Sequence, residues 1–445
     1  MYAHYFLYYS TADPRPQPAY DAILGDMNVY FSGLGGVGIG PLVEIARDVG
    51  HTVLGSDLED GLVTHELRER GITVSIGQDG TFLRASHNNT PIDWFVHTAA
   101  LPDNHPELVL ARELGLRIGK RDEFLAYIIQ EKDLKLIAIS GTHGKTTTTG
   151  MMVWTMLQLG IPISYSVGTT LPFGPSGKYD PDSTFFVYEC DEYDRNFLNF
   201  FPHVSLLTAV DYDHPDTYPT EQEYIDAFQQ YITQSDHTIM WQEDADYLQS
   251  NPPNAWILQD PLDVSLPGAH NRRNATLVAK ALEYLTLAEE GRAAATLAQF
   301  PGTDRRFEKL DDNLYTDYGH HPKEIAATLQ LARELSDHIV LVYQPHQNRR
   351  QHRIIDTYRD QFEQADTIYW LPTYLSREDP DELILTPEDL TEKITNKAAV
   401  HIAELDENLW QKIATARQSG SLVLCMGAGT IDAWVRQRLA SSTHK

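Results

Sequence analysis

The stretch LKLIAISGTHGKTTTTG, at residues 134–150, constrains the fold of this chain more than any other segment. An apolar run enters it and a helical pattern leaves it, which predicts a strand, a tight loop and a helix. Such loops bind phosphate through backbone amides and a helix N-terminus, and here Lys145 supplies charge and Thr146 a hydroxyl for magnesium. The usual motif has a glycine five positions before Gly144, where this chain has Ile139. The residues therefore predict a shortened nucleotide-binding loop.

Strand and helix patterns alternate along most of the chain, which is typical of parallel sheets with helical crossovers. New strand runs near Lys135 and Thr303 divide it into three α/β domains. The first segment, 1–26, contains PRPQP and no clear periodicity, so we expect it to be dispensable, with Met27 as the native start. The predicted domains that follow this extension span residues 27–133, 134–302 and 303–445.

The composition disfavours several classes of partner. The formal net charge of -28 disfavours binding to nucleic acids or anionic membranes, which requires a basic surface. The chain has no run of about 18 apolar residues, so we expect no membrane insertion, and its first residues do not resemble a signal peptide. The two cysteines, Cys190 and Cys425, lie in apolar runs and are expected to be buried free thiols. The cysteines suggest a reducing compartment, so we expect a cytoplasmic protein. We also expect a monomer or a weak homodimer, although the composition does not determine which.

Two acidic loops follow the next strand-like runs. Glu189 ends the run FFVYE and begins ECDEYD, at the edge where open α/β sheets bind ligands. His214 lies among three aspartates in DYDHPDTY. An acidic loop is often only a solvated turn, but these loops follow the phosphate loop closely, and carboxylate oxygens suit Mg²⁺. The sequence therefore favours a metal site with Thr146, Glu189 and His214 as ligands.

Cations are concentrated in two later segments. Arg305 and Arg306 adjoin in PGTDRRFE, where they suit phosphate oxygens, although surface salt bridges are the alternative. YQPHQNRRQHR places Arg349, Arg350 and Arg353 within one short segment of an otherwise acidic chain. This local density is what a substrate carrying a carboxylate would require.

A glycine-rich segment, SGLGGVG, follows the first predicted strand. Gly33, Gly35 and Gly38 match the dinucleotide fingerprint, and Asp57 follows in GSD. A fingerprint of this kind is weak evidence when it occurs alone. It indicates that a diphosphate binds at the helix N-terminus and does not identify the nucleotide.

Taken in order, GTHGKTTTT, ECDEYD, DYDHPDTY, PGAHNRRNA, RRFE and DYGHHP resemble the motifs of the Mur ligases in type and spacing. These are ATP-dependent, amide-forming enzymes of peptidoglycan precursor synthesis, and the resemblance covers about residues 27–432. In this family the shortened phosphate loop is the normal form. The resemblance implies a Rossmann-like N-terminal domain for a UDP-sugar, a P-loop central domain for ATP and a Rossmann-like C-terminal domain for the amino acid.

The resemblance also implies roles for individual residues. The ATP-binding residues would be Gly141, Thr142, His143, Gly144, Lys145, Thr146, Thr147, Asn274 and Arg306, with Mg²⁺ on Thr146, Glu189 and His214. The UDP-sugar would bind Gly33, Gly35, Gly36, Gly38 and Asp57, and the amino acid would bind Tyr318, His320 and Arg350. Lys145, Arg306 and His320 would be catalytic. The amine must lose a proton, and the sequence leaves open whether His320 or His321 accepts it.

Within the family, the resemblance implies that L-alanine is joined to UDP-N-acetylmuramate through an acyl phosphate. Tyr318 and Gly319 in DYGHHP favour L-alanine, as does DTY after His214. The alternative amine is the tripeptide used by the recycling members of the family. The two alternatives differ in the number of carboxylates that the C-terminal domain must hold.

Three departures from the family pattern stand out. Gln229 occupies the position where sister ligases carry a carbamylated lysine, which favours the alanine or tripeptide branch. Gln347 occupies a position where arginine is usual, which weakens the assignment of the amino-acid site. The stretch between Trp241 and Leu266 is shorter than usual, and we expect little effect on the chemistry.

Proteins of other classes explain only parts of the sequence. An NAD-dependent oxidoreductase would account for SGLGGVG but not for GTHGKTTTT. A P-loop kinase or GTP-binding switch would account for the phosphate loop but not for DYGHHP. A binding protein without catalysis is disfavoured because the charged motif residues are in place, apart from the position of Gln347.

Overall fold

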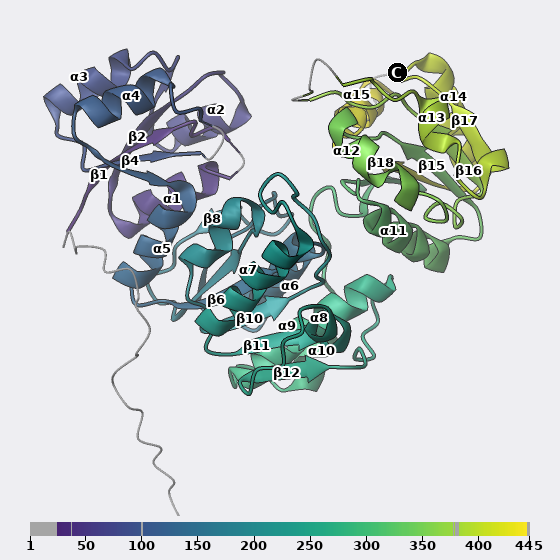
Figure 1. The fold of residues 1–445 in the computed structure, drawn as a ribbon, viewed down its shortest axis with the longest axis horizontal. Coiled ribbons are helices and arrows are strands. Elements are labelled where there is room, and N and C mark those ends of the chain that lie inside the picture. The colour runs from purple at the N-terminus through teal and green to yellow at the C-terminus, as the bar shows by residue number, and fades with distance from the viewer. Residues whose placement is uncertain (1–24, 37, 99–100, 377, 379–381, 443–445) are drawn as a thin grey trace, which may run out of the picture.

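The computed structural model describes residues 25–36, 38–98, 101–376, 378 and 382–442, which form three α/β units, each around its own sheet (Figure 1). This arrangement confirms the predicted fold class. Nearly all of the predicted extension, 1–26, lies outside the described residues, so its dispensability stays a prediction. Cys190 and Cys425 are buried free thiols, as predicted. Within the described residues, no helix combines the length and apolar character needed to cross a membrane.

The N-terminal sheet is parallel throughout, in the order β3-β2-β1-β4-β5. Its central strand, NVYFS, is buried after its first residue, as expected when helices cover both faces of a sheet. The glycine fingerprint begins where this strand ends. The elements are β1 (Asn28–Ser32), α1 (Gly40–Val49), β2 (Thr52–Asp57), α2 (Leu62–Glu69), β3 (Thr73–Ile76), α3 (Thr81–Asn89), β4 (Trp94–His97), α4 (Pro106–Glu113), β5 (Arg117–Lys120) and α5 (Arg121–Glu131).

The central sheet has the order β12-β11-β10-β6-β9-β7-β8 and is parallel except for the β7–β8 pair. Because β10, β6 and β9 are neighbours, the loops that follow them meet at one edge. The elements are β6 (Lys135–Ser140), α6 (Lys145–Gln158), β7 (Ile163–Ser166), β8 (Gly177–Lys178), β9 (Phe185–Glu189), η1 (Tyr193–Asn199), β10 (Val204–Leu207), α7 (Glu221–Gln234), β11 (Thr238–Trp241), α8 (Gln242–Tyr247), β12 (Ala255–Leu258), α9 (Ala269–Tyr284) and α10 (Glu290–Leu297).

The C-terminal sheet has the order β13-β14-β18-β15-β16-β17, with an antiparallel hairpin at one edge. Its central strands, IVLVY and LVLCM, are buried at every position. The elements are β13 (Glu308–Asp311), β14 (Leu314–Asp317), α11 (Pro322–Leu335), β15 (Ile339–Tyr343), α12 (Asn348–Ile354), η2 (Ile355–Thr357), β16 (Thr367–Trp370), α13 (Pro387–Thr391), η3 (Lys397–Ala399), β17 (Val400–Ile402), α14 (Glu407–Gln418), β18 (Leu422–Met426) and α15 (Ile431–Ser442).

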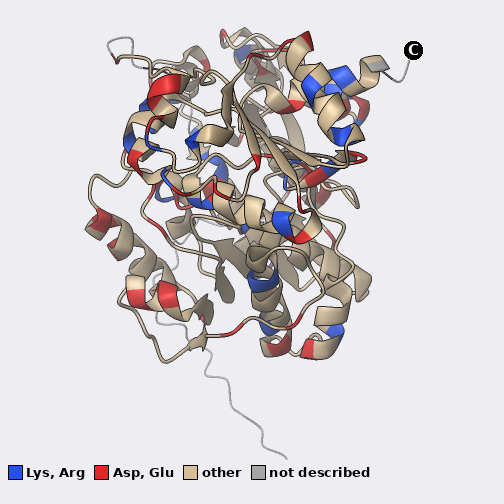
Figure 2. Ribbon diagram, turned by 90° about the vertical axis from the view of Figure 1, so that its right-hand side faces the viewer, with Lys and Arg blue, Asp and Glu red and all other residues tan. Residues whose placement is uncertain are grey.

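The two junctions between the units differ in chemistry. One hydrophobic cluster runs from Phe124 and Tyr127 of α5 to Tyr188 and Phe197 of the central unit. The central and C-terminal units meet instead through α9 and α11, where Arg272, Glu334 and neighbouring polar groups pair. Figure 2 shows that acidic and basic residues are distributed over the molecule. The cations that matter for an anionic ligand are therefore those that line its cavity.

Candidate active site

The predicted phosphate loop joins β6 to α6. Gly141 and Gly144 have positive φ angles of 126° and 86°, which side chains with a Cβ rarely adopt. A Cβ at Gly141 would also lie 2.7 Å from the carbonyl oxygen of Ala209, because the loop passes closely under the end of β10. Thr142 Oγ1 donates a hydrogen bond to the Asp211 carbonyl at 2.7 Å. These contacts fix the loop against the segment that follows β10.

Lys145 begins α6 and reaches back over the loop. Its Nζ donates to the Gly141 carbonyl at 2.6 Å and to Glu192 Oε2 at 2.7 Å. Burial opposes the charged form of this lysine, but Glu192 and other nearby carboxylates outweigh burial and raise its pKa above the usual value. Thr146 Oγ1 donates to Glu189 Oε1 at 3.0 Å. A fixed positive charge and a hydroxyl group thus stand together at the start of the helix.

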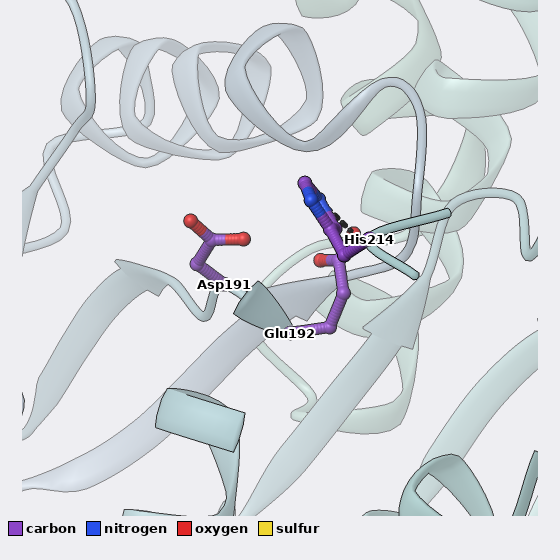
Figure 3. Close-up of side chains that lie close together, drawn as sticks. All are labelled: Asp191, Glu192 and His214. Atoms are coloured by element: carbon purple, nitrogen blue, oxygen red, sulfur yellow. Dashed lines mark ion pairs between the residues drawn. The ribbon is translucent and has the colours of Figure 1, made fainter. Parts of the chain in front are cut away.

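Asp191, Glu192 and His214 lie close together beside the loop (Figure 3). Each offers a ligand atom within 4.8 Å of the other two. Glu192 is fully buried, and its Oε1, which has no hydrogen-bond partner among the described residues, lies 3.8 Å from His214 Nε2. Two carboxylates and an imidazole suit a divalent cation. The structure thus brings His214 to Asp191 and Glu192, whereas Thr146 contacts Glu189.

A cavity of about 370 Å³ opens beside the phosphate loop, between the central and C-terminal units. His143, Gly144, Thr147, Asn274 and Arg306 line it, as expected of ATP-binding residues. A Cβ at Gly144 would lie 3.1 Å from Asn274 Oδ1, so this amide packs directly on the loop. The remaining residues predicted for ATP, at 141, 142, 145 and 146, belong to the same loop and the first turn of α6 but do not line the cavity.

A second cavity, of about 830 Å³, lies between the same two units. His214 lines it from the central unit, and Gln347, Arg349 and Arg350 line it from the C-terminal unit. Lys323 borders both cavities, so the two adjoin. Of the three residues predicted for the amino acid, Arg350 belongs to this lining. The other two, at 318 and 320, have their ring centroids 5.6 Å apart and lie outside it.

His320 and His321 follow β14 at the junction. Burial is the main cause that lowers the pKa of each to about 4, so both are neutral near pH 7. His320 Nδ1 lies 3.1 Å from the Tyr318 carbonyl, which assigns the proton to Nδ1 and leaves Nε2 as an acceptor. The His321 ring packs on the His143 ring, with centroids 4.6 Å apart. Both histidines thus meet the chemical requirement for accepting a proton.

The residues predicted for the UDP-sugar come together at the carboxyl edge of the N-terminal sheet. Gly35 N donates to Asp57 Oδ2 at 2.7 Å, which ties the fingerprint loop to the end of β2. Gly33 has a positive φ of 82°, and its carbonyl accepts from Gly36 N at 3.1 Å. Gly38 follows in the same turn before α1. The backbone amides of this turn are therefore arranged by local contacts.

Gln229 and Gln347 differ in whether they line a cavity. Gln229 lies on α7, donates to the Leu248 carbonyl at 2.7 Å and belongs to the lining of neither of the two cavities. Gln347 lines the larger cavity with a positive φ of 61°, a conformation that costs energy in a residue with a Cβ. Of these two departures from the family pattern, Gln347 is therefore the one that lines a cavity large enough for a ligand.

Glu324 is a site residue that the sequence reasoning missed. Its Oε1 lies 3.4 Å from His143 Nδ1, and its Oε2 accepts the backbone amides of His320 and His321. Burial opposes ionisation of this carboxyl, but His143 and His320 outweigh burial and hold its pKa well below the usual value. The spacing from His321 marks Glu324 only as a helix cap, and no local pattern connects it to the phosphate loop.

Three family models match the chain in order. They are the Mur ligase family catalytic domain at residues 28–133, the Mur ligase middle domain at 139–257 and the Mur ligase glutamate ligase domain at 305–429. A UDP-N-acetylmuramate–L-alanine ligase of Renibacterium salmoninarum is 32% identical, covering 91% of this chain and 93% of its own length. A protein of the same name from Caldicellulosiruptor saccharolyticus is 30% identical, covering 94% and 100%.

Two solved structures share the fold. A UDP-N-acetylmuramate-alanine ligase of Thermotoga maritima matches with a TM-score of 0.74 at 23% identity, covering 94% of this chain and 99% of that one. A murein peptide ligase of Psychrobacter arcticus matches with a TM-score of 0.62 at 23% identity, covering 93% and 98%. The three matched domains and the relatives that share about 30% identity along nearly the whole chain lead to one conclusion. The chain belongs to the Mur ligase family.

Proposed function

We propose that this protein is an ATP-dependent ligase that joins L-alanine to UDP-N-acetylmuramate in peptidoglycan precursor synthesis. The observation that carries this proposal is the position of the phosphate loop beside two adjoining cavities. One is lined by Asn274 and Arg306, and the other by His214 and Arg350. The relatives named above carry this activity in their names.

The proposed chemistry has two steps, in which the protein positions groups and neutralises charge. Lys145 and Arg306 hold the γ-phosphate of ATP while the lactyl carboxylate of the sugar attacks phosphorus. A new carboxylate–phosphorus bond forms, the bond to the ADP oxygen breaks, and ADP leaves. The amine then attacks the carbonyl carbon of the acyl phosphate, and inorganic phosphate leaves with the electron pair of the broken C–O bond.

Charge in the first step is balanced by the loop and by the acidic cluster. Thr146, Glu189 and His214 are the proposed Mg²⁺ ligands. The Glu192 Oε1 beside His214, which no described residue hydrogen-bonds, supports a cation there. The bound Mg²⁺ would neutralise phosphate oxygens during transfer. The oxygen-rich donor set fits this ion.

We assign the proton transfer to His320. The Tyr318 carbonyl fixes its Nδ1–H, so Nε2 keeps a free lone pair. Burial has the largest effect on the pKa of the same imidazole and lowers it, and Glu324 opposes burial. The charge of Arg350, on α12, lowers the pKa further, so this guanidinium lies close by. The proposed arrangement holds the α-carboxylate on Arg350 and the ammonium near His320. His321, with an equally low pKa, is the alternative acceptor.

One observation favours a second amine substrate. The larger cavity has a volume of about 830 Å³, and Arg349 and Arg353 line it together with Arg350. None of these three side chains forms an ion pair within the described part of the chain. A tripeptide with several carboxylates would use this space and charge. L-alanine is preferred because the curated relatives named above are L-alanine ligases.

The remaining assignments follow from this proposal. The UDP-sugar domain spans 27–133, the ATP domain 134–302 and the amino-acid domain 303–445. The UDP-sugar binds to Gly33, Gly35, Gly36, Gly38 and Asp57, and the amino acid binds to Tyr318, His320 and Arg350. A cytoplasmic location and a monomer or weak homodimer stay predictions.

The experiment that tests the proposal is ADP release by the purified protein with each substrate omitted in turn. We expect multiple turnovers of ADP release only when ATP, Mg²⁺, UDP-N-acetylmuramate and L-alanine are all present. With ¹⁸O in the lactyl carboxylate, one labelled oxygen should pass to inorganic phosphate. ADP release that needs no UDP-N-acetylmuramate, or phosphate without label, would contradict the acyl-phosphate route.

A further inference from the structure

The two cavities between the central and C-terminal units have one lining residue in common among the described residues. This residue is Lys323, in the first turn of α11. His143 and Arg306 line only the smaller cavity, and His214 and Arg350 line only the larger one. Lys323 therefore lies at the border where the two spaces adjoin.

The proposed chemistry brings one group to this border. The phosphoryl group leaves ATP in the smaller cavity, and the amine attacks the resulting acyl phosphate from the larger one. The acyl phosphate therefore has to lie within reach of both spaces. Its phosphoryl oxygens carry negative charge in both steps, and an ammonium group already placed to donate hydrogen bonds to them lowers the barrier.

Carboxylates surround this lysine. Asp211 and Glu324 line the smaller cavity beside it, and Asp213 lines the larger one. These negative charges repel a phosphoryl group that approaches the border. A cation has to meet the group there, and Lys323 is the cation that both linings share.

The Lys323 ammonium is oriented and still has free donors. Its Nζ donates to Asp211 Oδ1, and it has no other ion pair or hydrogen bond to the described part of the chain. Asp211 is fixed to the phosphate loop, because its backbone N–H donates to Thr142 Oγ1 at 2.8 Å. An ammonium group has three N–H donors, so two remain for phosphoryl oxygens. The side chain is 62% exposed, so a ligand can reach it.

The fold alone gives a poor reason for a lysine at this position. The N-terminus of a helix carries partial positive charge, which disfavours a cation in the first turn of α11. An ion pair as exposed as that of Lys323 with Asp211 stabilises a fold only slightly. An anionic group at the border would interact favourably with both the ammonium and the helix N-terminus.

We propose that Lys323 is a catalytic residue that binds the phosphoryl group of the acyl phosphate, at the border between the two cavities. This inference rests on the proposed function and adds a residue to both of its steps. The ammonium donates hydrogen bonds to non-bridging phosphoryl oxygens and keeps its protons throughout. The bonds that form and break are therefore those already given for the two steps.

The test measures the first step in the full-length wild type, in Lys323→Met and in Lys323→Arg. Rapid-quench experiments follow ADP formed in a single turnover from ATP, Mg²⁺ and UDP-N-acetylmuramate, without L-alanine. We expect Lys323→Met to form ADP about 10- to 100-fold more slowly, and Lys323→Arg to recover much of the rate because it keeps the charge. Calorimetric dissociation constants for ATP and UDP-N-acetylmuramate should change by less than about threefold, because the contact forms as the phosphoryl group is transferred.

A control variant separates catalysis from the contact between the units. Arg272→Met removes another ion pair across the same junction, with Glu334, and both residues lie outside the two cavities. This variant should form ADP at the wild-type rate. Thermal unfolding should show that both methionine variants are folded.

Three results would overturn the inference. They are a wild-type rate in Lys323→Met, an equal loss of rate in Arg272→Met, and a loss of substrate affinity in Lys323→Met as large as its loss of rate. The last result would assign Lys323 to binding of the substrates rather than to the transfer. Failure of the unaltered protein to form ADP from ATP and UDP-N-acetylmuramate would instead contradict the proposed function itself.

Discussion

At the scale of single residues, the phosphate loop depends on one ammonium group. Lys145 is held over the loop by Gly141 and Glu192, and both contacts are shorter than 3 Å. A charge fixed in this way needs little reorganisation when charge develops on phosphate. Glu192 and Asp191 lie beside the same ammonium group and keep its charge in this position.

We therefore expect Lys145→Ala to lower turnover by more than about a thousandfold while the protein stays folded. ADP release and the thermal unfolding midpoint measure the two effects separately. Lys309→Ala, which removes an exposed lysine from the β13–β14 hairpin, is the matched control and should retain activity. Turnover near the wild-type rate in Lys145→Ala would refute the assignment of the loop.

Arg350 gives a second prediction at this scale. It lines the larger cavity and lies near Asp213. Burial raises the pKa of Asp213, whereas His214 and then Arg350 lower it. Replacing it by alanine should raise the Michaelis constant for L-alanine by about tenfold or more and leave that for ATP nearly unchanged. The exposed Arg359 of the same unit serves as the control in an Arg359→Ala variant. An equal rise for both substrates would remove Arg350 from the amino-acid site.

At the scale of secondary-structure elements, α8 carries a buried acid against the end of β10. Asp244 is 4% exposed, and its Oδ1 accepts from Val210 N at 2.9 Å, while its Oδ2 has no partner among the described residues. Burial raises the pKa of Asp244 to about 7. The folded protein therefore binds this proton more tightly than the unfolded chain, whose aspartates titrate near pH 3.9.

The sign of the pH effect follows from this difference. The stabilising contribution of the protonated acid is fully present below about pH 4 and is lost as the pH rises through 7. Asp244→Asn should remove this dependence on pH. The free energy of unfolding of the variant, relative to that of the wild type, should therefore rise with pH over this range, by at most about 1.4 kcal/mol per unit of pKa difference. Denaturant unfolding at about pH 5 and pH 8 measures the effect. Asp246→Asn, an exposed position on the same helix, should show no such trend.

The elements also show what sequence patterns can predict. LKLIAIS and FFVYE are apolar runs bounded by loops with functional residues, so the predicted strands and the loops after them agree with β6 and β9. The site contacts that were missed join residues far apart in the chain, such as His143 with Glu324 and Gly38 with Arg121. The first pair arises when two units pack together and the second when two segments meet within the N-terminal unit, and neither periodicity nor motif spacing records such packing.

At the scale of the whole molecule, the two junctions differ in strength. An apolar cluster joins the N-terminal and central units, whereas polar pairs join the central and C-terminal units. Polar contacts exchange with water at little cost, so the C-terminal unit is the one expected to move during the reaction. The contact between His143 and Glu324 links the phosphate loop to α11, and Glu324 also accepts the backbone amide of His320.

This link predicts coupled effects on catalysis. His143→Ala and Glu324→Gln should each lower kcat/KM for L-alanine by about tenfold, and the double variant should lose little more than either alone. A double-mutant cycle measures the coupling, expected to be about 1 kcal/mol. Arg272→Ala with Glu334→Ala, a pair across the same junction but outside both cavities, is the control cycle. Purely additive losses for His143 and Glu324 would show that the two residues act independently.

The identity of the amine tests the account of the whole molecule most directly. The measurement is mass spectrometry of the products formed from UDP-N-acetylmuramate, ATP and Mg²⁺ with L-alanine and the tripeptide offered together at equal concentration. We predict that the UDP-sugar gains the mass of one alanine residue, with one ADP released for each product formed. Faster formation of the tripeptide product, or no amide product at all, would contradict the assignment of this protein as an L-alanine ligase.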